Sequence, residues 1–265
     1  EIAKLGDFYV NDAFGAAHRN HTSTAKLAKI VKPAVSGLLM EKEIRCLSEA
    51  LDNPTRPFTA IVGGAKVSSK IGVLENLLDK VDNMIIGGGM AYTFVKANGG
   101  KIGTSICEDD QIDVALAIQK KAQDKGVKLV MASDVLVTDD FSGNGTNKVV
   151  DVKNIPDGFE GVDAGPNTQK AFDEVIKTSK TILMNGPVGA FENPKFAEGT
   201  KAVLQAVVDA TKAGATSVIG GGDSVSAAKK FFKAEDFTHV STGGGASLEF
   251  IEGKILPGVA ALDEK

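Results

Sequence analysis

The stretch TSVIGGGDSVSAAKK, residues 216–230, places three glycines, an acid and a serine directly after an apolar run. The glycines at 220–222 tolerate positive φ and let backbone N–H groups approach an anion closely. Ser224 follows at the position where a helix N-cap is expected. Asp223 would repel a bound phosphate unless a divalent cation lay between them. This carboxylate therefore predicts Mg²⁺ shared between the protein and a nucleotide.

Glycine-rich turns also follow four other apolar runs. They lie in AIVGGAKVSSK (60–70), MIIGGGMAYTF (84–94), ILMNGPVGAF (182–191) and HVSTGGGASLEF (239–250). One such turn is ordinary in an α/β protein. In a parallel sheet, however, all five turns gather at the carboxyl edge, where ligands bind. The pattern therefore predicts a single phosphate-binding rim built from five distant segments.

Two familiar nucleotide-binding motifs are absent from the sequence. A Walker A loop needs Ser or Thr after Gly-Lys, but isoleucine follows both Gly-Lys pairs, at 100–101 and 253–254. The dinucleotide fingerprint G-x-G-x-x-G/A also fails, because its last position holds Tyr92, Val225 or Leu248 in the three candidate turns. The sequence thus disfavours a dehydrogenase of the Rossmann type.

His18, Arg19 and His21 stand on a predicted polar loop over residues 14–23, after a predicted strand over 7–13. Two histidines three apart, with no Cys or acid at ligand spacing, favour hydrogen-bonded surface groups over a metal site. The chain opens at Glu1, without Met, in what looks like the end of a helix and an interior strand. We therefore expect an upstream part to be absent.

The composition limits the class of protein. With 265 residues, 43% hydrophobic and 24% charged, the chain can bury a sizeable core in one or two domains. A net charge of −4 argues against whole-surface attraction to nucleic acid or to an anionic membrane. Cys46 and Cys107 are far apart, which predicts reduced, buried cysteines of a cytoplasmic protein. No apolar run reaches the roughly 18 residues that a membrane-spanning helix needs.

Strand-like and helix-like segments alternate from residue 58 onward, and the strands are almost entirely apolar. This pattern is typical of a parallel sheet covered on both faces, so the predicted fold class is α/β, a Rossmann-like three-layer sheet with helices on both faces. Helices are predicted over 110–125, 168–177 and 197–211, a single strand over 127–137, and a polar connector over 138–149.

An amphipathic helix is predicted after Pro33, because apolar residues recur there at three- and four-residue spacing. It ends at NPTRP, residues 53–57. Its apolar positions are Val35, Leu38, Leu39, Leu47, Ala50 and Leu51.

Several long motifs in fixed succession resemble the phosphoglycerate kinase family over essentially the whole chain. They are GDFYVNDAFGAAHRNHTS, VGGAKVSSKIGVLENLLDKVDNMIIGGGMAYTF, NGPVGAFE, IGGGDS and STGGGASLEF-x-EGK-x-LPGV. The resemblance implies the glycolytic transfer of the acyl phosphate of 1,3-bisphosphoglycerate to Mg-ADP, giving 3-phosphoglycerate and ATP, or the reverse. It also implies a monomer with two similar domains that close about a hinge.

On this pattern the chain divides into a remnant of the N-terminal substrate domain (1–32), a linking helix (33–52), the nucleotide domain (53–252) and a C-terminal tail (253–265). Most of the substrate domain, including the arginines that grip the glycerate, is expected to be missing. We therefore expect the 265-residue chain to bind nucleotide but to turn over poorly.

The resemblance also assigns the nucleotide site. Lys66 and Lys70 match phosphate ligands, although a lysine beside a glycine turn is more often a solvated surface charge. Glu192 matches a ribose-binding acid, although NGPVGAFE also fits a plain strand-ending turn. Asp223 and Ser224 match the magnesium and phosphate pair. The other nucleotide-binding positions are Gly64, Ala65, Gly88, Gly161, Asn185, Gly186, Val188, Phe191, Gly221 and Gly222.

The transferred group has its own positions in the resemblance. Arg19 matches a substrate-phosphate arginine, and His18 accompanies it. The catalytic positions are Arg19, Lys66, Gly222, Gly244 and Gly245.

Phosphoryl transfer of this kind needs no general base. The attacking ADP oxygen, or the carboxylate in reverse, is already ionised near neutral pH, so catalysis consists of alignment and charge neutralisation. Lysine, arginine, Mg²⁺ and backbone N–H groups provide both. The alternative is a non-catalytic nucleotide-binding module that begins near Glu1. Both readings expect ADP or ATP as partner, and neither expects nucleic acid or a membrane.

Overall fold

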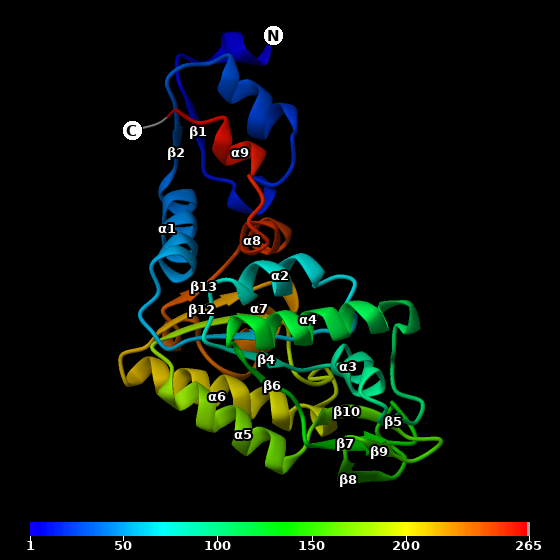
Figure 1. Cartoon of the computed structure of the whole chain (residues 1–265). Helices are drawn as coiled ribbons and strands as arrows, with labels where there is room; N and C mark the ends of the chain where they lie inside the picture. Colours follow the sequence, from blue (N-terminus) through cyan, green and yellow to red (C-terminus); the bar gives the residue numbers. More distant parts are fainter. Residues whose placement is uncertain (264–265) are drawn as a thin grey trace.

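A six-stranded parallel sheet forms the centre of the molecule, in the order β13-β12-β11-β3-β4-β6 (Figure 1). The structure is a computed structural model that describes residues 1–263. The strands of this sheet are β3 Phe58–Val62, β4 Asn83–Ile86, β6 Lys128–Val130, β11 Thr181–Asn185, β12 Thr216–Gly220 and β13 His239–Val240. The parallel arrangement that the alternation of strands and helices predicts is confirmed.

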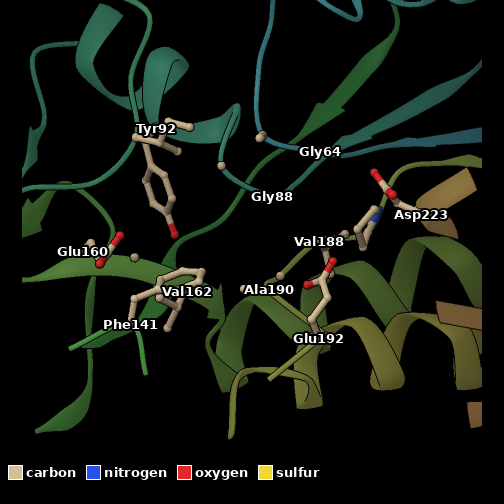
Figure 2. Close-up of a pocket in the computed structure, with 16 residues that line it drawn as sticks. Gly64, Gly88, Tyr92, Phe141, Glu160, Val162, Val188, Ala190, Glu192 and Asp223 are labelled. Atoms are coloured by element: carbon tan, nitrogen blue, oxygen red, sulfur yellow. The ribbon is translucent and has the colours of Figure 1, made fainter. Parts of the chain in front are cut away.

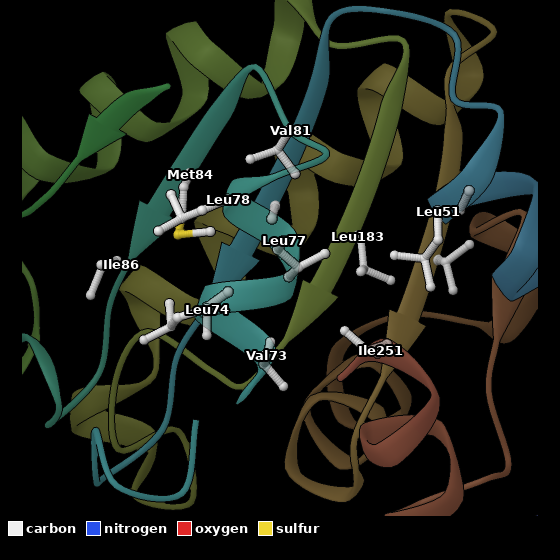
Figure 3. Packing of buried hydrophobic residues seen from close by; sticks show 14 of the residues in the cluster. Leu51, Val73, Leu74, Leu77, Leu78, Val81, Met84, Ile86, Leu183 and Ile251 are labelled. Carbon is white, nitrogen blue, oxygen red and sulfur yellow. The ribbon is translucent and has the colours of Figure 1, made fainter. Parts of the chain in front are cut away.

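Helices cover both faces of this sheet, because side chains alternate across each strand. In β3, Phe58, Ala60 and Val62 pack toward α1, α2, α4 and α8, whereas Ile61 packs with α5, α6 and α7. In Figure 3, Leu74 and Leu78 of α2 pack with Met84 of β4. The helices are α1 Leu38–Asp52, α2 Ile71–Leu78, α3 Ala91–Ala97, α4 Ile112–Lys125, α5 Pro166–Thr178, α6 Glu198–Lys212, α7 Gly222–Phe231 and α8 Gly245–Ile251. The predicted three-layer α/β fold is therefore confirmed.

A second, antiparallel sheet lies beside α3, in the order β10-β7-β8. Its strands are β7 Asp134–Thr138, β8 Asn147–Asp151 and β10 Glu160–Ala164, and a short parallel pair, β5 Lys101–Ile102 with β9 Asn154–Ile155, completes this side. The predicted single strand over 127–137 is wrong, since β6 stops at Val130 and β7 belongs to this second sheet. The predicted connector over 138–149 likewise includes the start of β8.

Asp134 fixes the start of β7 against α5. Its carboxylate accepts the backbone N–H groups of Asn167 and Thr168, at 3.1 and 2.8 Å, in the first turn of α5. The Thr168 hydroxyl in turn accepts the backbone N–H groups of Ser133 and Asp134. These contacts hold the start of β7 against α5. Sequence periodicity carries no signal for such a tertiary contact.

The N-terminal lobe, residues 1–37 with 257–263, stands apart from the main sheet (Figure 1). Its core is the parallel pair of β1 Tyr9–Asn11 and β2 Ala34–Ser36, with helix α9 Pro257–Ala260 packed against the turn at Thr22–Lys26. Short helical turns at Ile2–Leu5, Phe14–Ala16, Thr22–Lys26 and Leu27–Lys29 occupy most of the rest. The predicted helix from Pro33 is wrong at its start: residues 34–36 pair with β1, so α1 begins at Leu38.

Two smaller predictions are also tested. Cys46 and Cys107 are free thiols, as predicted, but both are half-buried and not buried. None of the helices among residues 1–263 combines the length and apolar character that a bilayer crossing demands.

Candidate functional site

Two of the glycine turns lie directly against each other. Gly63 N–H donates to the carbonyl of Asn185 at 3.0 Å, and Gly64 N–H donates to that of Pro187 at 3.1 Å. A Cβ atom built on Gly63 would lie 2.0 Å from the carbonyl oxygen of Pro187, and one on Gly186 would lie 2.1 Å from that of Gly63. Glycine is therefore required on both sides of this contact.

A third turn joins this pair. Gly88 adopts φ +71°, donates its N–H to the carbonyl of Val188 at 3.1 Å and leaves no room for a side chain beside Gly64. Met90 N–H donates to the carbonyl of Gly64 at 3.0 Å. The turns that follow β3, β4 and β11 thus form one continuous backbone surface.

Ser224 connects the fourth turn to the same surface, but in a way that the sequence did not predict. Its hydroxyl is fully buried and accepts the backbone N–H of Gly186. The N-cap position of α7 is Gly221, at φ +85°, so the predicted N-cap role of Ser224 is wrong. Ser224 is part of the helix, and its hydroxyl turns back toward the neighbouring loop.

The fifth turn follows the edge strand β13. Ser241 N–H donates to the carbonyl of Ile219 at 2.8 Å, and a Cβ on Gly220 would lie 3.9 Å from the Ser247 hydroxyl. All five turns therefore lie along the carboxyl edge of one sheet, as predicted.

A cavity of about 300 Å³ opens beside these turns (Figure 2). Asp223 and Glu192 lie at one end, and Tyr92 and Glu160 lie at the other. Seven residues that the sequence assigned to a nucleotide line it: Gly64, Ala65, Gly88, Gly161, Val188, Glu192 and Asp223. A volume of this size suits a small-molecule ligand.

Cationic and amide groups lie next to the Asp223 end. Lys66 is exposed, whereas Lys70 is half-buried and its ammonium donates to Asn185 Oδ1. Burial lowers the pKa of Lys70, against the opposing attraction of Asp223 and Glu252. Asn185 is fully buried, and its Nδ2 has no hydrogen-bond partner among residues 1–263. This N–H₂ group can donate to an anion placed beside Gly221, whose Cβ position lies 3.0 Å away.

Three of the assigned residues support the site without lining the cavity. Ser224 and Gly186 hold the turns together, as described above. Phe191 is buried and packs edge-on against Phe231, with ring centroids 6.5 Å apart. Gly222 is exposed, and no described atom lies within 4 Å of its Cβ position. The space in front of α7 is therefore open.

His18 and Arg19 do not line the cavity, and His18 lies against the fifth turn. A Cβ on Gly245 would lie 3.1 Å from His18 Nε2, so the imidazole stands over the first turn of α8. His18 Nδ1 is buried with no partner within the described chain. Arg19 is exposed, and Gly244, at φ +50°, has open space around it.

Comparisons with known proteins agree with this geometry. The sequence profile of the family described as "Phosphoglycerate kinase" matches residues 1–254. The chain belongs to the phosphoglycerate kinase family. A solved phosphoglycerate kinase from Coxiella burnetii is similar over 98% of this chain, at 45% identity and a TM-score of 0.93. Another, from Pyrococcus horikoshii OT3, is similar over 98%, at 32% identity and a TM-score of 0.84. This chain spans only 66% and 65% of those two structures.

Sequence reasoning missed Glu43, which lies on α1. It is fully buried on α1, where Oε2 accepts His239 Nε2–H at 2.8 Å and Oε1 accepts the Thr242 N–H at 2.6 Å. Burial opposes ionisation, but the hydrogen bonds from His239 and Thr242 hold the pKa of Glu43 below its ordinary value. The available signal was an acid inside the apolar stripe formed by Met40, Leu47 and Leu51.

Asp163 on β10 was missed as well. Its Oδ2 accepts the Gly199 N–H at 2.6 Å in the first turn of α6, while its Oδ1 is buried without a partner in the described residues. Burial raises the pKa of Asp163 to about 7, although the N–H groups of Gly199 and Ala164 act in the opposite direction. Asp163 directly follows the cavity residue Val162 in β10.

Proposed function

We propose that this chain binds the magnesium complex of ADP or ATP in the cavity, as the nucleotide half of a phosphoglycerate kinase. The observation that carries the proposal is the convergence of the glycine turns after β3, β4 and β11 with the start of α7 around one cavity, which has the Asp223 carboxylate at one end. Backbone N–H groups and the unpartnered Asn185 amide point to an anionic ligand.

The positions of the side chains support an extended nucleotide. Glu192 lines the cavity at the same end as Asp223, where its carboxylate suits ribose hydroxyls. The phosphates then run past Gly64 and Ala65 toward Lys66, Lys70 and Asn185. The base occupies the end that is lined by Gly88, Gly161 and Val188.

Asp223 is the proposed magnesium ligand. It is exposed, lines the cavity and offers one carboxylate, and residues 1–263 contain no group of three His, Cys, Asp or Glu side chains suited to a metal. Mg²⁺ is commonly held by one or two carboxylates together with phosphate oxygens and water, so the residues present fit the ion. When bound, Mg²⁺ neutralises phosphate charge.

The proposed reaction moves the acyl phosphate of 1,3-bisphosphoglycerate to ADP, giving 3-phosphoglycerate and ATP. The side chains align the two substrates and neutralise the charge of the transferring phosphoryl group. Lys66 does so beside the nucleotide phosphates, and Arg19 and His18 do so on the glycerate side. Gly222 and Gly244 leave space for the transferring group, and Gly245 lies against the His18 imidazole. One contact of this kind contributes on the order of 3 kcal/mol to lowering the barrier. We also propose a glycolytic, cytoplasmic role as a monomer, with domain closure about α1.

Calorimetric titration tests the nucleotide site. The wild-type chain should bind Mg-ADP, and Asp223→Asn should weaken Mg-ADP binding at least about tenfold but metal-free ADP binding less than about twofold. Asp113→Asn, an exposed acid on α4, is the control that should change neither affinity. Failure of the wild-type chain to bind ADP would refute the proposal. Equal losses with and without Mg²⁺ would make Asp223 a structural residue.

A coupled kinase assay tests the glycerate side. Only Arg19 and His18 are assigned to the glycerate in this chain, so the 265-residue polypeptide alone should turn over poorly. Rates of about 100 s⁻¹, at the upper end for kinases, would contradict this expectation.

A further inference from the structure

The two carboxylates at the Asp223 end of the cavity lie on different elements. Asp223 is in the first turn of α7, whereas Glu192 lies in the turn that follows β11 (Figure 2). Glu192 is exposed, and its carboxylate makes no hydrogen bond or ion pair with the rest of residues 1–263. The position of this carboxylate therefore depends on what holds the backbone of its turn.

Lys230 connects this turn to α7. Its ammonium donates to the backbone carbonyl of Phe191 at 2.8 Å and to that of Glu192 at 3.1 Å. Neither carbonyl accepts another hydrogen bond in the described part of the chain. Hydrogen bonds from a charged donor are stronger than those between neutral groups. Lys230 is thus the main polar contact of the turn at the residue that carries the carboxylate.

Two aromatic rings hold the ammonium of Lys230 in place. It lies 5.7 Å from the ring centroid of Phe191 and 5.5 Å from that of Phe231. A cation at this distance is attracted to the ring. Phe191 belongs to the turn and Phe231 to the last turn of α7, and the rings pack edge-on. Although Lys230 is exposed, these contacts distinguish it from a lysine that meets only solvent.

Lys230 and Asp223 lie on the same face of α7. They are seven residues apart, which is two turns of helix, or roughly 10 Å along its axis. One rigid helix therefore carries the proposed magnesium ligand near its start and the tether of the Glu192 turn near its end.

We infer that Lys230 is a positioning residue, which holds the Glu192 turn on α7 so that Glu192 and Asp223 keep a fixed separation across the bound nucleotide. Lys230 does not line the cavity, so it acts through Glu192. The inference rests on the proposed function, since it requires a nucleotide whose ribose lies beside Glu192.

The 2′,3′-dideoxy analogue of ADP is the discriminating probe. It keeps the base and the phosphates but lacks the two hydroxyls that would donate to the Glu192 carboxylate. The wild-type chain should bind Mg-ADP about tenfold more tightly than the magnesium complex of the analogue. Displacement of Glu192 should lower this ratio, whereas a general loss of stability should weaken both ligands equally and leave the ratio unchanged.

Calorimetric titration of four proteins with the two ligands tests the inference. Lys230→Met keeps an apolar stem against the rings but removes the ammonium, so its ratio should fall below about threefold. Lys230→Arg can donate to both carbonyls and should stay within about twofold of the wild-type ratio. Lys229→Met is the matched control, because it removes the same charge from an exposed neighbour that has no partner among residues 1–263. Melting temperatures within a few degrees of wild type confirm that each variant is folded.

The outcomes separate this inference from the proposed function. A lower ratio in Lys230→Met, with wild-type ratios in Lys229→Met and Lys230→Arg, would support the inference. An unchanged ratio in Lys230→Met, or an equal fall in both methionine variants, would overturn it and leave the nucleotide site standing. Equal affinity of the wild-type chain for the two ligands would also overturn it, because no ribose contact would remain to be positioned. Absence of ADP binding in the wild-type chain would overturn both proposals.

Discussion

The sheet body, residues 58–251, and the N-terminal lobe bury apolar surface to very different extents. In the body, all five residues of β3 and all five of β11 are buried, and two large cores lie on the two faces of the sheet. In the lobe, the main buried cluster consists of four alanines, at 25, 28, 34 and 261. Of the thirteen large apolar side chains that are exposed among residues 1–263, six lie in the lobe, within residues 1–37.

The lobe depends on contacts between the two ends of the described chain. Gly258 N–H donates to the carbonyl of Ala17 at 2.8 Å, and Asp263 binds the backbone N–H of Ala34 and the ammonium of Lys32. Residues 257–263 therefore belong with the lobe in space, whereas the sequence assigned 253–265 to a tail, whose residues 264–265 lie outside the described range. The domain division itself remains a proposal. The comparison shows that the body has extensive apolar cores of its own, whereas the lobe is held together largely by contacts between distant parts of the chain.

The largest effect is expected where the two regions meet, at Glu43. Glu43→Ala removes a buried carboxylate and leaves His239 and the Thr242 N–H without their acceptor, which should lower the free energy of unfolding by about 3 to 5 kcal/mol. Urea unfolding measures this loss. The exposed Glu49→Ala on the same helix is the control and should change it by less than about 0.5 kcal/mol. Equal effects of the two variants would show that α1 is not held by this contact.

The next effect distinguishes glycines of the two regions. Gly63→Ala forces a Cβ into the backbone of Pro187, so it should cost about 3 kcal/mol of stability and weaken ADP binding. Gly6→Ala in the lobe has no close contact, because the nearest atom, Phe8 O, is 3.7 Å from its Cβ position. Thermal unfolding and ADP titration of both variants provide the measurement. A Gly63→Ala protein with wild-type stability and affinity would refute the close contact of the turns.

A smaller effect follows from Asp163 within the body. Because its pKa is raised from 3.8 to about 7 on folding, the folded state holds an extra proton between these values. Asp163 therefore contributes stability at low pH that is lost as pH rises toward 7, by up to about 1.4 kcal/mol per pH unit. Asp163→Asn should remove this component, whereas Asp113→Asn should retain it. Urea unfolding at pH 5 and pH 7 measures this change in stability. If Asp163→Asn showed the same difference in stability between the two pH values as the wild-type chain, Asp163 would not be its source.

The smallest effect is expected at the exposed start of α1, directly after the lobe. Leu38 is 84% exposed at the start of α1, so Leu38→Gln should change the free energy of unfolding by less than about 0.5 kcal/mol. Leu47→Ala, on the buried face of the same helix, should cost about 2 to 5 kcal/mol. A large loss of stability in Leu38→Gln would show that the start of α1 is covered in solution. The contrast in buried apolar surface between the body and the N-terminal part of the chain would then be smaller.

Sequence reasoning predicted the body better than the lobe. Strands such as FTAIV and TILMN are apolar on both faces, so a buried parallel sheet follows from composition alone. The cavity residue Asp223 was predicted from the glycine turn after such a strand, and Glu192 from the resemblance to the family. Tyr92 and Glu160 were not predicted, since an isolated aromatic or acidic residue carries no periodic signal.

The sequence by itself determined the α/β class, the five glycine turns at one sheet edge and the family, because these depend on local pattern and on motifs in fixed order. Only the tertiary structure decided that Ser224 joins two turns instead of capping a helix, that Asp134 binds the first turn of α5, and that Glu43 meets His239. Each of these depends on a partner between 34 and 196 residues away. Local spacing holds no information about such partners.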